Sequence, residues 1–199
     1  MLGSLHPIWD NARAYIIGGG PSVNDLDPEV LRGKHVVAVN NAYTVIPWAD
    51  VLYFMDCEWY NWNKEKILSF AGLKITTCKK LDKIPGFLSL QHGIRNGVDM
   101  RPEFLSRGAS SGQGAMNVAI KLGAKELVLI GFDMRVVDGV HNFHNDHGRK
   151  VPASIYLDQH AKSLKYMVPI AESLGIKIVN CTQDSAIDFI SIEPLEKWL

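Results

Sequence analysis

The chain has 199 residues, which suits one domain of ordinary size with a core large enough to need no disulfide staples. Its 21 basic and 21 acidic residues cancel, which excludes the globally basic surface that draws proteins to nucleic acid or anionic membranes. No apolar run approaches membrane-spanning length, and residues 1–10 lack a basic segment followed by an apolar stretch. We expect a cytoplasmic protein without a membrane span or a nucleic-acid partner.

Seven short apolar runs, rich in β-branched residues and separated by longer polar or amphipathic segments, recur along the chain. They are residues 15–17, 35–39, 51–55, 73–76, 87–90, 127–130 and 177–179. Such runs are typical of strands buried on both faces of a largely parallel sheet. The sequence therefore predicts a single α/β domain over residues 1–199, doubly wound and Rossmann-like, with helices on both faces of a mostly parallel sheet.

The first strand runs directly into the turn Gly18, Gly19, Gly20, Pro21 and Ser22. Without side chains, the backbone N–H groups of such a turn can approach an anionic ligand closely. Val23 replaces the third glycine of the dinucleotide fingerprint, and no Gly-Lys-Ser or Gly-Lys-Thr ending of a P-loop is present. The turn predicts a nucleotide site of another kind; a plain chain reversal is the alternative.

Polar residues follow the next two strands: Asn40 and Asn41 after the second, and Asp56 after the third. A helix is predicted over residues 56–70. Its aromatic residues favour core packing, or the subunit interface of a homo-oligomer, over a ligand cage. The three cysteines, Cys57, Cys78 and Cys181, are odd in number and widely spaced, and none lies in a Cys-x-x-Cys motif. They predict small buried hydrophobes in a reducing compartment.

Two further helices are predicted in the second half of the chain. The first carries an apolar face over residues 115–122, with Ser110 or Ser111 as its cap and Gly123 as its end. The second covers residues 157–171 and ends at Gly175, with a kink expected at Pro169.

The ends of the predicted strands meet at one edge of the sheet, where open α/β folds bind their ligands. There the N–H groups of Gly19, Gly20, Ser111 and Gly112 are expected to hold phosphate oxygens, helped by the helix dipole. Asn40 and Asn41 suit a base or ribose edge. Asp56 and Asp133 suit sugar hydroxyls, or Mg²⁺ on a diphosphate.

Residues 135–152 are polar and aperiodic, and the sequence predicts a lid-like loop. The loop holds His141, His144 and His147. Imidazole titrates near neutrality, which favours a catalytic base, with His144 or His147 as the candidate. A zinc site and a plain polar loop remain alternatives, and no metal ligand is assigned.

The order of these motifs along nearly the whole chain resembles two groups of proteins. The motifs are the glycine turn, Val39-Asn40-Asn41, Ser110-Ser111-Gly112, Leu129 to Met134, the histidine loop, Asn180-Cys181-Thr182 and Asp184-Ser185-Ala186. One group is prophage-encoded proteins of the 6-hydroxymethylpterin diphosphokinase-like group, and the other is Campylobacter-type bacterial sialyltransferases.

The sialyltransferase resemblance implies a transferase that uses a CMP-sugar donor and an unknown acceptor. It implies that Gly18, Gly20, Asn40 and residues 110–112 hold CMP, and that His144 or His147 is the general base. The tyrosine pair that assists CMP departure in that family has no clear match, since Phe143 stands in the loop. The diphosphokinase-like resemblance implies Mg-ATP pyrophosphoryl transfer with Asp56 and Asp133 as carboxylates. A third hypothesis is a phage-encoded nucleotide-binding or assembly protein without catalysis.

Overall fold

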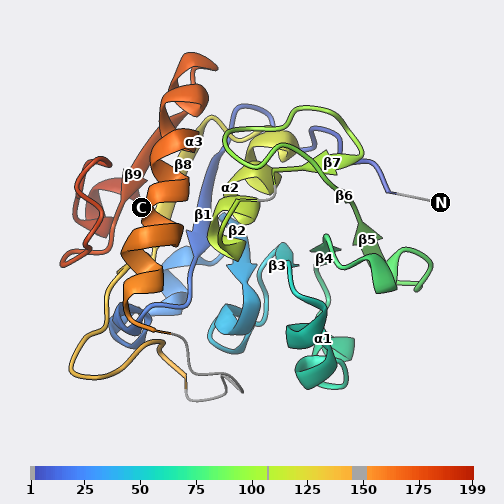
Figure 1. The fold of residues 1–199 in the computed structure, drawn as a ribbon, viewed down its shortest axis with the longest axis horizontal. Helices are drawn as coiled ribbons and strands as arrows, with labels where there is room; N and C mark the ends of the chain where they lie inside the picture. Colours follow the sequence, from blue (N-terminus) through green and yellow to red (C-terminus); the bar gives the residue numbers. More distant parts are fainter. Residues whose placement is uncertain (1–2, 107, 145–151) are drawn as a thin grey trace.

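The computed structural model describes residues 3–106, 108–144 and 152–199. Its centre is a parallel sheet of seven strands in the order β5-β4-β3-β2-β1-β8-β9 (Figure 1). The strands are β1 (Arg13–Ile17), β2 (His35–Val39), β3 (Val51–Phe54), β4 (Leu73–Thr76), β5 (Phe87–Ser89), β8 (Glu126–Ile130) and β9 (Lys177–Asn180). All seven coincide with the predicted apolar runs, so the parallel α/β fold is confirmed.

The strand order reverses between β1 and β8. From β1 the chain adds β2 to β5 outward on one side, and it then returns to add β8 and β9 on the other. Residues of β1 pair with both neighbours, for example Ile17 with Ala38 of β2 and with Ile130 of β8. The turn after β1 therefore lies at a topological switch point, the place where open parallel sheets leave a crevice for a ligand.

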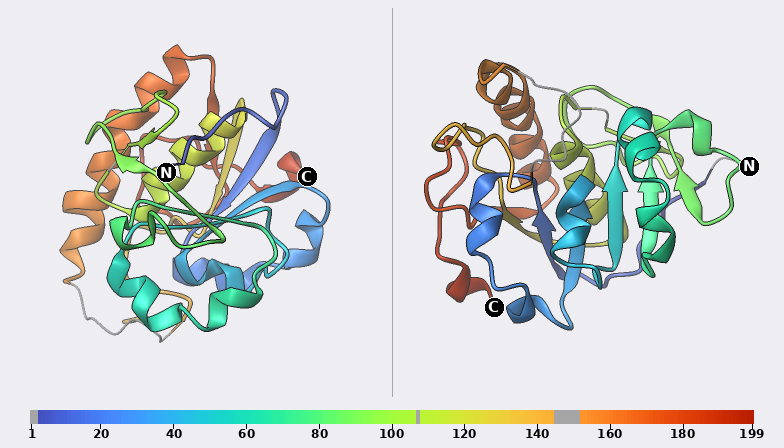
Figure 2. Two further views of the ribbon diagram at one scale, coloured as in Figure 1. Left: turned by 90° about the vertical axis from the view of Figure 1, so that its right-hand side faces the viewer. Right: turned by 90° about the horizontal axis from the view of Figure 1, so that it is seen from below.

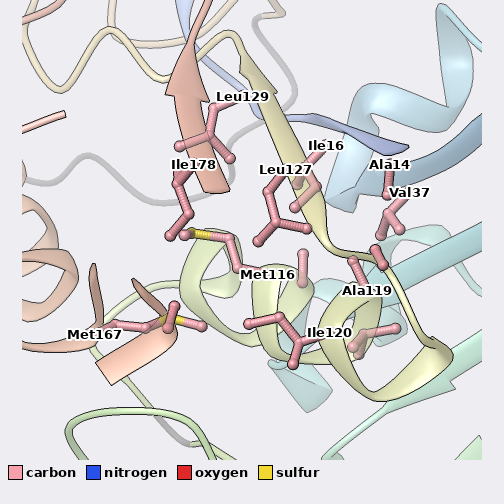
Figure 3. Packing of buried hydrophobic residues seen from close by; sticks show 14 of the residues in the cluster. Ala14, Ile16, Val37, Met116, Ala119, Ile120, Leu127, Leu129, Met167 and Ile178 are labelled. Atoms are coloured by element: carbon pink, nitrogen blue, oxygen red, sulfur yellow. The ribbon is translucent and has the colours of Figure 1, made fainter. Parts of the chain in front are cut away.

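Two α-helices cover one face of the sheet: α2 (Ser111–Leu122) and α3 (Lys162–Ser173), which lie side by side in Figure 1. Met116, Ala119 and Ile120 of α2 pack onto β1, β2 and β8 (Figure 3). α2 begins as predicted, because Ser110 Oγ accepts a hydrogen bond from Gln113 N at 3.4 Å. It ends at Gly123, whose φ of 109° is the left-handed conformation that glycine adopts most easily.

The opposite face is covered mainly by short turns instead of long helices, with the C-terminal turn on the far side of the sheet from α3 (Figure 2). These are the 3₁₀ turns η1 (Pro21–Asp25), η2 (Pro28–Leu31), η3 (Asn40–Thr44), η4 (Lys66–Ser69), η5 (Lys79–Leu81) and η7 (Leu195–Trp198), together with α1 (Cys57–Asn63). Short turns suffice because each inserts one or two large apolar side chains, such as Leu31 and Trp198, into the second core. Helical segments thus lie on both faces, as a doubly wound sheet requires.

Two predicted helices differ in detail from the structure. The helix expected over residues 56–70 is divided into α1 and η4, and only Trp59 and Asn63 of α1 are buried. The helix expected over residues 157–171 begins as a π-helix, η6 (Tyr156–Ala161), before continuing as α3. Pro169 lies inside α3 without ending it.

The long connection from β5 to α2 contains a second, two-stranded parallel pair, β6 (Gln91–His92) and β7 (Phe104–Leu105). It is fastened to α2 by buried polar groups. Asn117 Oδ1 accepts hydrogen bonds from Asp99 N at 3.2 Å and from Ser106 N at 2.7 Å. Lys121 donates to three backbone carbonyls of residues 101–104. Burial lowers the pKa of Lys121 to about 8.

Two of the three cysteines are joined in a disulfide. Cys57, the first residue of α1, is bonded to Cys78, and their Cα atoms lie 5.1 Å apart. The expectation of unpaired, buried thiols is therefore wrong for this pair, because the fold brings together two cysteines that are 21 positions apart in sequence. Cys181 is free and partly buried, and burial raises the pKa of its thiol to about 11. Within the described residues, no helix combines the length and apolar character needed to cross a bilayer.

Candidate nucleotide site

A cavity of about 310 Å³ lies at the carboxyl ends of the central strands. Its walls are residues 18–20 after β1, Val39 and Asn40 after β2, Met55, Asp56, Glu58, Trp59 and Trp62 around α1, residues 109–112 at the start of α2, residues 131–135 after β8, and His141, Asn142, Ile155, Tyr156 and His160 before α3. In Figure 1 the segment after β8 and α1 lie at the same end of the molecule. The cavity thus occupies the switch point between β1 and β8.

The glycine turn is packed against the end of β8. Gly18 N donates to Ile130 O at 2.7 Å, and Gly20 N donates to Gly131 O at 2.9 Å. A β-carbon on Gly18 would lie 2.5 Å from Gly131 O, so the close approach of two backbones requires glycine there. The N–H of Gly20 is committed to the protein and does not face a phosphate. Within the described part of the chain, the Gly19 N–H is the one of the three that remains for a ligand.

Asp133 is engaged by Ser22. Ser22 N donates to its Oδ1 at 3.1 Å and Ser22 Oγ to its Oδ2 at 2.8 Å. Asp133 lines the cavity at 4% exposure, whereas Pro21 and Ser22 lie outside the lining. The carboxylate therefore holds the first turn of η1 in place. Its catalytic role, like a ligand contact from Pro21 or Ser22, stays a prediction.

The start of α2 faces the same space. Ser110, Ser111 and Gly112 all line the cavity, and the helix has 12 residues. The first N–H groups of a helix have no acceptor within it, and the helix dipole adds partial positive charge there. This end of α2 and the Gly19 N–H therefore form a polar wall suited to an anion.

Asn40 and Asn41 separate in the structure. Asn40 lines the cavity in the left-handed conformation, with φ at 51°, and its Oδ1 is buried without a hydrogen-bond partner among the described residues. Non-glycine residues rarely adopt this conformation, and asparagine tolerates it best. Asn41 is absent from the lining and is 3% exposed, with its side chain between Trp59 and His144. The sequence could not separate them, because adjacent residues of a turn point in different directions.

Another part of the lining comes from α1 and the residue that precedes it. Asp56 and Glu58 bring carboxylates to the rim, and Trp59 and Trp62 bring indole rings. Trp59 also packs on Phe54 with 4.8 Å between ring centroids, which ties α1 to β3. Among the described residues, no three His, Cys, Asp or Glu side chains are grouped closely enough to hold a metal ion. Asp56 and Asp133 are therefore not part of such a cluster there.

Three ring-bearing side chains on the remaining wall were not assigned to the cavity by sequence. Tyr156 and His160 project from the π-helix η6, and His141 precedes them in the loop after β8. Tyr156 Oη lies 3.4 Å from His141 Nδ1, and the rings of Tyr156 and His160 meet edge to face at 5.6 Å. Burial lowers the pKa of His160 below its usual 6.5 and raises the pKa of Tyr156. At neutral pH the cavity thus contains a neutral imidazole beside a protonated phenol.

The two predicted catalytic histidines, His144 and His147, are not among the residues that line the cavity in the described part of the chain. His144 lies outside the cavity lining, with Nδ1 at 3.2 Å from Asn41 Nδ2. His147 and residues 145–151 lie outside the described residues, so the role of His147 and of the lid over residues 135–152 stay predictions. For Tyr156 and His160, by contrast, the sequence does contain a signal. Their 4-residue spacing places both side chains on one side of a helix.

No protein-family model and no curated protein sequence matches this chain. Solved structures do. The MAf glycosyltransferase from Magnetospirillum magneticum AMB-1 superposes with a TM-score of 0.66 at 15% identity, over 96% of this chain and 35% of that one. The sialyltransferase CstII from Campylobacter jejuni, in complex with cytidine-5'-monophosphate, gives 0.59 at 16% identity, over 94% of this chain and 86% of that one. Its complex with CMP-3FNeuAc gives 0.53 at 16% identity, over 92% and 86%.

The chain spans about a third of the MAf glycosyltransferase and most of CstII. At these identities the likeness is one of fold, and it confirms an α/β architecture shared with glycosyltransferases. The resemblance to Campylobacter-type sialyltransferases is therefore confirmed for the fold. The resemblance to prophage-encoded and diphosphokinase-like proteins stays a prediction.

Proposed function

We propose that this chain is a glycosyltransferase that binds a nucleotide-linked sugar, with a CMP-sugar as the first candidate, and transfers the sugar to an acceptor hydroxyl. The observation that carries the proposal is the composition of the cavity. An anion-binding wall, made by the Gly19 N–H and the start of α2, faces the same space as a neutral histidine and a tyrosine hydroxyl. The shared fold with CstII, solved with CMP, supports the choice of nucleotide.

In this proposal the donor phosphate lies against the start of α2. Ser110 and Ser111 hydroxyls and the first N–H groups of the helix stabilise the charge that develops on the phosphate oxygen as the sugar–oxygen bond breaks. Asn40 contacts the ribose or the base through its amide. Its Oδ1 is buried and lacks a partner among the described residues, and a hydrogen-bond donor of the ligand would satisfy it.

His160 is the proposed general base. It takes the proton of the acceptor hydroxyl, whose oxygen forms a bond to the anomeric carbon while the electron pair of the breaking bond goes to the phosphate oxygen. The lowered pKa of His160 keeps its imidazole neutral and able to accept that proton at pH 7. The hydroxyl of Tyr156, held near His141, can donate a hydrogen bond to the leaving phosphate.

The test is release of CMP from a CMP-sugar, measured with and without added acceptor. His160→Ala should lower turnover by roughly 10²-fold or more, as expected on loss of a general base, while CMP affinity changes little. His6→Ala is the matched control, because His6 is exposed and its ring contacts the nearby Ser4. Turnover of His160→Ala equal to that of the wild type contradicts the assignment of the base. Mg-ATP turnover in place of CMP release would establish the diphosphokinase-like alternative.

A further inference from the structure

Asn41 does not line the cavity, but its side chain contacts two segments that contribute to the cavity wall. It is 3% exposed, and its side chain lies between α1 and the segment that follows β8. Trp59 Nε1, on α1, donates to Asn41 Oδ1 at 2.6 Å. On the other side, Asn41 Nδ2 lies 3.2 Å from His144 Nδ1. One amide therefore contacts both Trp59 of the cavity wall and His144.

The chemistry of the three groups fixes the direction of both bonds. An indole nitrogen only donates, so the atom that meets Trp59 must be the amide oxygen. The amide NH₂ then faces His144, and because it too only donates, His144 Nδ1 must accept. An accepting Nδ1 means a neutral ring whose proton is on Nε2. In this arrangement neither ring nitrogen is able to take a proton from a substrate hydroxyl.

The segment that contains His144 is also fastened to the glycine turn. Phe143 N donates to Gly19 O at 3.1 Å, and the Phe143 ring packs against the second core. Directly before these two residues come His141 and Asn142, which line the cavity. The Asn41–His144 bond is thus a second attachment of residues 141–144, next to the two residues of this segment that line the cavity.

We propose that Asn41 and His144 are a positioning pair: their hydrogen bond fixes residues 141–144 against the glycine turn, and neither residue contacts the nucleotide or acts as the base. This assigns to both residues a role different from the ligand and base roles that the sequence suggested. The part of the inference that concerns ligand affinity rests on the proposed function.

Two readouts test the pair: hydrogen exchange of the Phe143 amide, and CMP affinity by calorimetric titration. His144→Ala should speed the exchange and weaken CMP binding, each by about tenfold, because detachment of residues 141–144 from the glycine turn competes with the bound geometry. His144→Gln should restore most of both losses, since its Oε1 can accept from Asn41 Nδ2. Asn41→Leu combined with His144→Ala should be no worse than the more affected single variant, as expected for two partners of one bond. His6→Ala is the control.

Exchange in His144→Ala equal to that of the wild type overturns the proposal. Loss of CMP-sugar turnover by about 10²-fold in His144→Gln, with the exchange unchanged, also overturns it and identifies His144 as the base. If wild-type protein fails to bind CMP, the proposed function is wrong, and the exchange measurements still decide the positioning pair. Asn41→Leu leaves a buried indole N–H without this partner. The variants of His144, which is itself half-buried, therefore decide the question if Asn41→Leu does not fold.

Discussion

The disulfide between Cys57 and Cys78 should contribute measurably to stability. It closes a loop of 21 residues. In the chain-entropy model, a cross-link of this span removes enough freedom from the unfolded chain to stabilise the native state by about 3 kcal/mol. For a chain of 199 residues, each kcal/mol shifts Tm by about 2–4 °C. Reduction should therefore lower Tm by about 6–12 °C.

The assay is thermal unfolding of the wild type with and without a phosphine reductant, beside the double variant Cys57→Ser/Cys78→Ser. The variant should melt at the temperature of the reduced wild type and should not respond to reductant. Cys181→Ser, which removes the free cysteine, should respond as the wild type does. A Tm that is independent of reductant, together with three titratable thiols in the unreduced, unfolded protein, would refute the reasoning.

Three further predictions follow from local geometry. Gly20→Ala places a β-carbon on Asp133 Oδ2 and 2.8 Å from Gly131 O, so it should lower the free energy of unfolding by about 1–3 kcal/mol in a denaturant titration. Gly19→Ala should be nearly neutral, because the nearest atom to its β-carbon is 3.5 Å away, and equal losses in the two variants would contradict this. Ser111→Glu puts an anion at the start of α2 and should weaken CMP binding more than tenfold with little change in Tm; unchanged affinity in titration calorimetry removes this helix start from the site. The Arg101 guanidinium holds the pKa of Asp99 at about 2, so the ionised carboxylate adds about 2 kcal/mol to the free energy of unfolding above pH 4, and this is lost as pH falls through 2. Asp99→Asn should therefore reduce the dependence of the unfolding free energy on pH between pH 2 and 5, and an unchanged dependence would disprove the assignment.

The strands could be predicted because each is a short apolar run, most of them β-branched and buried, and that signal is local. Ser110 as a cap and Gly123 as a helix end were readable for the same reason, since capping depends on residues a few positions apart. The cavity's position followed from the general rule for parallel sheets, once the strands were placed.

The remaining features depend on tertiary contacts that no local pattern encodes. Asn40 and Asn41 are neighbours in sequence, yet one lines the cavity and the other is buried behind it. The disulfide depends on the packing of α1 against the segment after β4. The spacing of Tyr156 and His160 places both on one side of a helix, but which side faces the cavity depends on how η6 packs.

The central claim is that the cavity at the switch point is a nucleotide site, and the most direct measurement is the shift in Tm produced by CMP, compared with CTP and with ATP plus Mg²⁺. A ligand that binds only the native state at about 100 times its Kd adds about 2.7 kcal/mol, or roughly 5–10 °C for a chain of this size. The account predicts a shift of that order with CMP or CTP and a smaller one with ATP. A larger shift with ATP plus Mg²⁺, or no shift with any nucleotide, would contradict it.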